Sequence, residues 1–284
     1  MKWTAKQFLD WPNKVVTLLG MSGVGKTAFS LKLPRDTWFH YSGDYRIATR
    51  YLDEPILDEV KRLAMQNPDL RHLLMTDAIY IRNNFTFEQQ FSMSNFLGKI
   101  GNPERGGLSI DEFKRRQAIF RDAEIQTMFD VEVFMEKSRF IYGYPHFIND
   151  AGGSICGLTD SECWDRLSRV SVVLYLHADD SLEHVLIDRA TRKPKPLFYE
   201  SDFLDAHLAQ YLEEHSMKSS DEIDPDEFVR WVFPLLIDYR RPQYERIAGK
   251  FGYTIEAEKI WGLRDEKDIL ELLCDTLDNP LAGE

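Results

Sequence analysis

The hydrophobic pattern of the chain contains short apolar runs separated by longer stretches of helical spacing. Five of these runs are interpreted as β-strands, because they are apolar, rich in β-branched or aromatic residues, and followed by turn or helix-start residues. They cover residues 15–19, 37–41, 144–149, 170–177 and 253–257. Helical material between consecutive strands is typical of a parallel, doubly wound sheet. The pattern therefore predicts an α/β fold with a five-stranded parallel sheet.

The second and third strands are separated by about a hundred residues, far more than one crossover helix needs. Apolar residues recur at helical spacing over 56–66, and residues 85–97 are rich in Phe and Met. Ser109-Ile-Asp-Glu112 fits a capping box that opens a long helix. The buried side of that helix is expected to carry Phe113, Phe120, Ala123, Met128, Val131 and Met135. We expect residues 55–139 to form a helical insertion, an acceptor- or partner-binding cap, on a core made of residues 1–54 and 140–284.

A second helical unit is expected over residues 181–249, as a lid-like segment of the core. It contains the hinge Arg192-Lys-Pro-Lys-Pro196 and an acidic loop over residues 219–226. Asp224-Pro225 at the end of this loop is a helix-start signature.

The segment after the first strand, Gly20-Met-Ser-Gly-Val-Gly-Lys-Thr27, fits the phosphate-binding P-loop pattern Gly-x-x-x-x-Gly-Lys-Ser/Thr. Backbone N–H groups of such a loop cradle phosphates, the lysine reaches the β- and γ-phosphates, and the hydroxyl binds Mg²⁺. The expected nucleotide-binding residues are Gly20, Ser22, Gly23, Val24, Gly25, Lys26, Thr27 and Ala28. The motif predicts a nucleoside triphosphate site, with Lys26 catalytic and Thr27 on the metal.

The second strand leads into Ser42-Gly-Asp-Tyr-Arg46 at the carboxyl edge of the predicted sheet, where ligands of such sheets bind. Asp44 there can bind Mg²⁺ through water or accept a proton from a substrate hydroxyl, and Arg46 can hold a substrate anion. The alternative is a plain Gly-Asp turn with a solvated arginine.

The third strand ends in Asp150-Ala-Gly-Gly-Ser154. A carboxylate in this place is a usual second anchor for Mg²⁺ in P-loop proteins. Gly153 and Ser154 are candidate substrate-binding residues, because glycine permits close backbone approach and the serine adds a hydroxyl. Asp150 is followed by Ala rather than by the Glu that many hydrolytic ATPases use. The alternative role of Asp150 is to cap the next turn, and which of Asp44 and Asp150 serves the metal stays open.

Four cations follow the fourth strand within seven residues: Arg189, Arg192, Lys193 and Lys195. Phosphoryl transfer needs cations to meet the charge that develops on the γ-phosphate, and a closing lid is a usual way to supply them. The alternative is a solvated helix end whose basic residues complement the helix dipole.

Near the last strand, Arg240 or Arg241 can reach the nucleotide, and Arg241 is taken as the candidate. The alternative is that this segment is the start of a surface helix.

These pieces together resemble the small-molecule P-loop kinases, the group that includes nucleoside monophosphate kinases, shikimate kinase and gluconate kinase. The resemblance is carried by the P-loop, by the Gly-Asp…Arg step at 43–46, by the strand and helix over 170–192, and by Arg241-Pro-Gln-Tyr-Glu-Arg-Ile-Ala248. It implies a P-loop NTPase three-layer sandwich with strand order 2-3-1-4-5, ATP–Mg²⁺ as phosphoryl donor, and Arg189 and Arg192 as lid arginines. The long insertion and the Asp150-Ala-Gly-Gly-Ser loop depart from the family, so no known acceptor is implied.

The composition of the chain limits the classes of ligand and the cellular compartment that we expect. The chain has 284 residues and a net charge of −12, from 35 basic and 47 acidic side chains. An acidic surface disfavours general nucleic-acid binding. Cys156, Cys163 and Cys274 lack metal spacing and are expected to be reduced thiols of a cytoplasmic protein. No apolar signal core or membrane-length run is present.

The leading hypothesis is an ATP-dependent kinase that acts on a small molecule, with the helical insertion building the acceptor side. One alternative is a regulatory ATPase or nucleotide switch whose insertion binds a protein partner. Another is a toxin-like kinase that modifies a nucleotide sugar or a macromolecule.

Overall fold

The computed structural model describes residues 3–86, 91–157 and 161–280. Its centre is one sheet of five parallel strands in the order β2-β3-β1-β4-β5. The strands are β1 (Val15–Leu19), β2 (Trp38–Ser42), β3 (His146–Asp150), β4 (Val172–His177) and β5 (Gly252–Glu256). The predicted fold class and strand order are therefore confirmed; β1 has the predicted bounds, and no end of the other strands is shifted by more than two residues.

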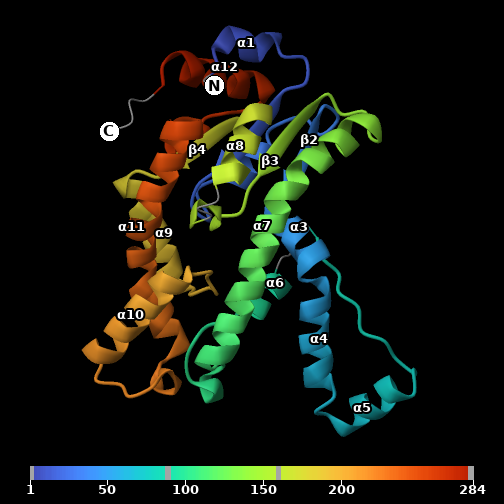
Figure 1. Ribbon diagram of the computed structural model, residues 1–284, viewed down its shortest axis with the longest axis vertical. Helices are drawn as coiled ribbons and strands as arrows, with labels where there is room; N and C mark the ends of the chain where they lie inside the picture. Colours follow the sequence, from blue (N-terminus) through green and yellow to red (C-terminus); the bar gives the residue numbers. More distant parts are fainter. Residues whose placement is uncertain (1–2, 87–90, 158–160, 281–284) are drawn as a thin grey trace.

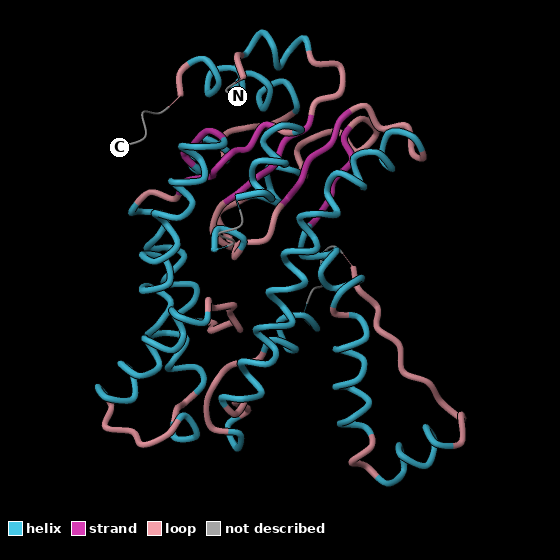
Figure 2. The backbone as a smooth tube through the Cα atoms, in the orientation of Figure 1, coloured by secondary structure: helices cyan, strands magenta, loops and turns pink. Residues whose placement is uncertain are grey.

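Helices pack around this sheet and extend below it (Figures 1 and 2). They are α1 (Ala5–Asp10), α2 (Lys26–Ser30), α3 (Gly43–Arg46), α4 (Asp53–Ala64), α5 (Pro68–Met75), α6 (Phe91–Leu97), α7 (Ile110–Phe140), α8 (Ser161–Val170), α9 (Asp180–Arg192), α10 (Ser201–Glu214), α11 (Pro225–Phe251) and α12 (Glu266–Asp278). The structure also contains the π-helix η1 (Ile47–Tyr51) and the 3₁₀-helices η2 (Pro103–Arg105), η3 (Ile155–Gly157), η4 (Ser220–Glu222) and η5 (Ala257–Ile260). Because β1 is central, the loop that follows it lies between the carboxyl ends of β3 and β4.

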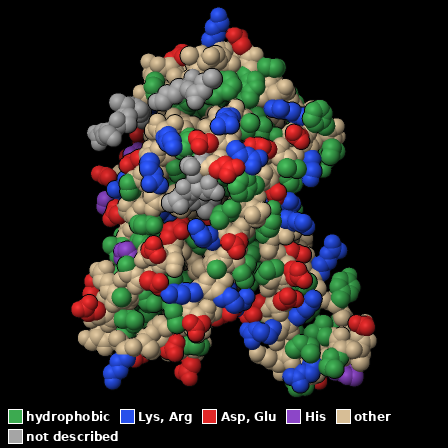
Figure 3. Space-filling model, viewed as in Figure 1, with side chains coloured by type: hydrophobic (Ala, Val, Ile, Leu, Met, Phe, Trp, Pro, Cys, Tyr) green, Lys and Arg blue, Asp and Glu red, His purple; other side chains and the backbone are tan. Residues whose placement is uncertain are grey.

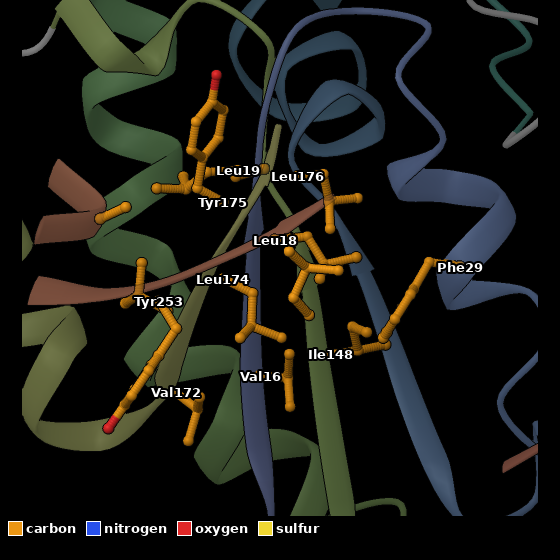
Figure 4. Packing of buried hydrophobic residues seen from close by; sticks show 14 of the residues in the cluster. Val16, Leu18, Leu19, Phe29, Ile148, Val172, Leu174, Tyr175, Leu176 and Tyr253 are labelled. Carbon is orange, nitrogen blue, oxygen red and sulfur yellow. The ribbon is translucent and has the colours of Figure 1, made fainter. Parts of the chain in front are cut away.

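The main hydrophobic core lies on the strands of this sheet (Figure 4). Val16, Leu18, Ile148 and Leu174 are at most 1% exposed, as expected for strands that are covered by helices. Such burial of apolar surface is the main contribution to the stability of the sheet. It also fixes the strand register on which the edge residues depend.

The long helix α7 contributes to three hydrophobic clusters. Its C-terminal half packs into the main core through Met128, Val131 and Met135. Phe120 and Ala123 belong to a second cluster with Ile47, Leu52, Ile56, Met93, Phe96, Leu97 and Phe198. Phe113 belongs to a third cluster that joins α7 to α10 and α11. The predicted apolar side of this helix is confirmed.

The capping box predicted at the start of α7 is wrong. Ser109 occupies the N-cap position, but its side chain accepts no hydrogen bond from the first turn. The carboxylate of Glu112 is instead bound by the guanidinium groups of Arg115 and Arg116. These bonds join two ionised groups, so they replace the single bond to the backbone N–H that the Glu112 carboxylate would accept in a capping box.

Within the described residues, the insertion contains the helices α4, α5, α6 and α7, while residues 79–86 form neither helix nor strand. Residues 87–90 of the segment 85–97 lie outside the described residues. In Figure 1, α4 and α5 form an arm that points away from the sheet. None of the residues of α5 is buried. Figure 3 shows hydrophobic and basic side chains together on this part of the surface.

Two helix ends are set by local hydrogen bonds. The helix after the P-loop, α2, ends at Ser30, because tighter i to i+3 bonds from Lys32 and Leu33 replace helical ones. α11 begins at Pro225, and the Asp224 side chain accepts bonds from the backbone of Asp226 and Glu227, which confirms the helix-start signature.

None of the three cysteines, which all lie in the described residues, forms a disulfide: Cys156 and Cys163 are buried and Cys274 is partly buried. Among the described helices, none combines the length and apolarity needed to cross a membrane.

Candidate nucleotide and acceptor site

The P-loop connects β1 to α2 and folds around the side chain of Lys26. Gly25 has a φ of +114°, a left-handed conformation that side-chain-bearing residues rarely adopt, and this turns the chain into α2. The Lys26 ammonium donates to the carbonyl oxygens of Gly20 at 2.8 Å and Met21 at 3.2 Å. Burial lowers the pKa of Lys26, and the nearby carboxylates of Asp150 and Asp44 oppose that shift.

Thr27 and Asp150 meet at the carboxyl edge of the sheet. Asp150 is the last residue of β3 and is in register with Leu18 of β1, so its side chain lies beside the P-loop. The Thr27 hydroxyl donates to Asp150 Oδ2 at 2.6 Å. A hydroxyl and a carboxylate are hard oxygen donors of the kind that Mg²⁺ prefers. These two side chains therefore fit the Mg²⁺ of a bound nucleotide.

The loop after β3, residues 150–157, packs directly on the P-loop. A Cβ on Gly153 would lie 3.0 Å from the backbone nitrogen of Ser22, so only a glycine allows this approach without displacement. The carbonyl oxygen of Gly153 accepts hydrogen bonds from the Tyr244 hydroxyl and from Arg240 Nη1, the latter at 3.3 Å. Helix α11 thus holds the β3 loop against the P-loop.

Asp44 approaches the same edge from β2. Ser42 is in register with Asp150 and caps α3 by accepting a bond from the Tyr45 backbone, which places Asp44 in the first turn. Loss of water contact and the charge of Asp150 raise the pKa of Asp44 to about 6, against the effect of Lys26. The structure thus brings Asp44, Asp150 and Lys26 together.

Sequence reasoning missed Glu124, which lies on α7 and is 1% exposed. The hydroxyl of Ser154 donates to its Oε1 atom. A Cβ on Gly152 would lie 2.9 Å from Glu124 Oε1 and 3.5 Å from Asp44 Oδ1, so the two carboxyl groups flank this glycine. Burial raises the pKa of Glu124 to about 8. The sequence feature that indicates its burial is its spacing on the apolar stripe of α7, four residues after Phe120 and four before Met128.

Arg240, rather than its neighbour, is the buried arginine of α11. Its exposed fraction is 5%, and Nη2 donates to the carbonyl oxygen of Phe198 at 2.8 Å. Arg241 forms an ion pair with Glu183 of α9, with Nε 2.8 Å from Oε1. The role of Arg241 at the nucleotide stays a prediction, and it would require that pair to open.

The remaining predicted cations lie away from these carboxylates or are engaged elsewhere. Arg46 pairs with Asp130 at 2.7 Å and lies over the ring of Phe134, so a substrate anion would have to displace Asp130. Arg192 pairs with Asp188 at 2.7 Å on the surface of α9. Arg189, on the same helix, is exposed, and no ion pair is found for it within the described residues.

The segment that follows α9, residues 193–199, is anchored to α7 by hydrogen bonds at its C-terminal end. Gln117 of α7 donates to the carbonyl oxygen of Leu197 and accepts from the backbone of Tyr199. Lys193 and Lys195 are exposed before this anchor. A lid motion would therefore be confined to the residues that precede Leu197.

Comparisons with known proteins leave the family open. No family model matches the chain, and no curated protein matches it. Among solved structures, a shikimate kinase from Bacteroides thetaiotaomicron is 16% identical, with 79% of this chain and 98% of that chain covered and a TM-score of 0.31. A likeness this distant adds nothing to what the strand order and the site geometry already show.

Proposed function

We propose that the protein is an ATP-dependent phosphotransferase that acts on a small hydroxyl-bearing molecule. The observation that carries the proposal is the Thr27–Asp150 hydrogen bond of 2.6 Å beside the buried Lys26, with Asp44 on the neighbouring strand end. This arrangement supplies a triphosphate cradle, a metal-binding pair and the carboxylate of Asp44 in the first turn of α3, which directly follows β2.

The donor half consists of the P-loop and the β3 end. Thr27 and Asp150 would hold the Mg²⁺ of ATP, which supplies positive charge to the β- and γ-phosphates. When ATP binds, the Lys26 ammonium would leave the carbonyl oxygens of Gly20 and Met21 and donate to phosphate oxygens instead. The backbone N–H groups of the P-loop would bind the other phosphate oxygens.

In the transfer step, the acceptor hydroxyl oxygen bonds to the γ-phosphorus while the bond from this phosphorus to the β–γ bridging oxygen breaks. The electron pair leaves with ADP, and the hydroxyl proton passes to the Asp44 carboxylate. A carboxylate with a pKa near 6 accepts a proton more readily than an ordinary aspartate. Most of the catalysis comes from positioning and electrostatics, so no strong base is needed.

Transfer to an acceptor is favoured over hydrolysis by the residue that follows Asp150. Ala151 is 2% exposed and has no group that could activate water. The next residues pack against the P-loop and α7, and the carboxylates near them, Asp44 and Glu124, come from other elements.

The arm formed by α4 and α5 supports a second candidate function, a nucleotide-dependent switch. Leu70, Leu73 and Met75 of α5 are exposed, with Met75 at 72%, and a protein partner could cover them. ATP turnover without any acceptor, stimulated by a protein, would favour the switch over the kinase.

The direct test is transfer of label from [γ-³²P]ATP to small molecules in the presence of Mg²⁺. Lys26→Ala should abolish the labelled product, while Lys6→Ala, an exposed lysine on α1, should leave it unchanged. Release of inorganic phosphate with no labelled small molecule would contradict the proposal.

A further inference from the structure

Three carboxyl groups surround the β3 loop without an ion-pair partner among the residues that the structure describes. Asp44 and Glu124 flank Gly152, and Glu200 lies against Gly157, where a Cβ would overlap its Oε1 atom. Glu124 interacts electrostatically with both of the others. They come from α3, α7 and the N-cap of α10, which are distant in sequence.

Arg240, a buried cation that interacts electrostatically with Glu124 and Glu200, has no ion pair with either of them among the described residues. Arg240 uses Nη1 and Nη2 to bind the carbonyl oxygens of Gly153 and Phe198. Its charge lowers the energy of the ionised forms of Glu124 and Glu200, yet the pKa of each is raised because desolvation is the larger effect. Within the described residues, the guanidinium group of Arg240 therefore makes these hydrogen bonds to backbone carbonyl oxygens rather than to the two glutamates.

The Glu124 side chain carries the observation that points to a ligand. Its Oε1 atom is bound by Ser154, but Oε2 is buried and has no hydrogen-bond partner within the described residues. A buried carboxyl oxygen left without a donor is costly, so a group that donates to it from a ligand would be strongly favoured. The same carboxyl group faces Asp44 across Gly152.

We propose that the acceptor carries an ammonium group, which Glu124 binds next to the hydroxyl that Asp44 orients, and this rests on the kinase function proposed above. The chemical class is a hydroxylated amine, such as an amino sugar or an amino alcohol. Glu200, which interacts electrostatically with Glu124, would add further negative charge for an ammonium group.

Two other occupants fit the geometry less well. An anionic acceptor would meet Asp44, Glu124 and Glu200, while Arg46 and Arg241 are engaged with Asp130 and Glu183. A metal ion is disfavoured because, within the described residues, no three acidic, histidine or cysteine side chains converge closely enough to hold one.

The test uses the full chain, Mg²⁺, [γ-³²P]ATP and small molecules extracted from bacterial cells. Ion exchange separates the extract into cationic, neutral and anionic fractions, and part of each is N-acetylated in water, which neutralises amines and leaves hydroxyls free. We expect label in the cationic fraction only, and acetylation should remove at least about nine-tenths of it, as expected for loss of a charge-assisted hydrogen bond.

Variants assign the effect to Glu124. Glu124→Gln should raise the apparent KM for the cationic fraction about tenfold or more and leave the affinity for a fluorescent ATP analogue unchanged. Glu132→Gln, on the same helix but paired with Arg166 at the surface, is the matched control and should change neither. Glu124→Asp keeps the charge, serves if the glutamine variant does not fold, and should raise KM less.

The outcomes separate the two proposals. Label in the neutral or anionic fraction, or label that survives acetylation, overturns the ammonium inference and leaves the kinase standing. An unchanged KM in both Glu124 variants also overturns it. If the chain binds the ATP analogue and labels nothing in any fraction, both proposals fall.

Discussion

The backbones of Gly153 and Ser22 are in contact, so that a Cβ added to Gly153 would lie 3.0 Å from the Ser22 nitrogen. The β3 loop and the P-loop therefore pack directly against each other. A change in either loop should move the other.

Gly153→Ala should lower the rate of phosphoryl transfer about tenfold, because the added methyl group displaces the Ser22 backbone by a few tenths of an ångström from its phosphate-binding position. Steady-state kinetics with ATP would measure this. Gly249→Ala is the control, since no atom lies within 4 Å of its added Cβ, and in α11 it should raise stability by up to about 1 kcal/mol. Equal activity of the two variants would contradict the packing argument.

Asp150→Asn should reduce phosphoryl transfer by about a hundredfold or more, because a neutral amide stabilises the metal far less than a carboxylate. The Thr27 hydroxyl would still find an oxygen acceptor, so the fold should survive. Titration with a fluorescent nucleotide with and without Mg²⁺ separates the effects. Wild-type protein should gain affinity from Mg²⁺, and the variant should gain little; an equal gain would argue against a metal-binding role.

The activity should fall as the pH drops below about 6, because Asp44 must be ionised to accept the hydroxyl proton and its pKa is raised to about 6. The pH profile of kcat/KM reports this group in the free enzyme. Asp44→Asn should lower activity throughout and remove the acidic limb. A profile in Asp44→Asn with the same limb as wild type would assign the limb to another group.

Glu124→Gln should stabilise the protein at high pH. The folded-state pKa of Glu124, about 8, lies above its ordinary value of 4.5, so the native state binds more protons between these values. Its contribution is fully present below pH 4.5 and is lost as the pH rises through 8. At pH 9 the variant should exceed wild type by a few kcal/mol, as the size of the shift implies.

Urea unfolding at pH 5 and pH 9 measures this difference directly. Asp44, Glu200 and Arg240 face the same carboxyl group and are present in both proteins, so the comparison isolates Glu124. A stability difference that does not change with pH would mean that Glu124 is ionised throughout.

The sequence predicts those parts of the site that depend on a local motif or on the end of a strand. The P-loop spacing defines Lys26 and Thr27, and the apolar run before Asp150 places that carboxylate at the end of a strand. Parallel strands bring their carboxyl ends to one edge, so the proximity of Thr27 and Asp150 follows from topology alone.

The remaining parts depend on how helices rotate against their neighbours. Arg240 and Arg241 are adjacent in sequence, but successive residues of a helix point about 100° apart, and only the packing of α11 decides which is buried. Arg46 finds its partner Asp130 across 84 residues. Glu124 has the spacing of the apolar stripe of α7, but only the fold shows that the β3 loop lies against its carboxyl group.

The sharing of α7 among three hydrophobic clusters bears on how the protein unfolds. Met128 belongs to the same cluster as the sheet, although it lies within the segment expected to form a separate cap. Removing residues 55–139 would therefore take away one wall of the sheet as well as the insertion. Backbone amides along the central turns of α7 should exchange with solvent only through cooperative opening of the whole molecule, while those of α5 exchange through local fraying.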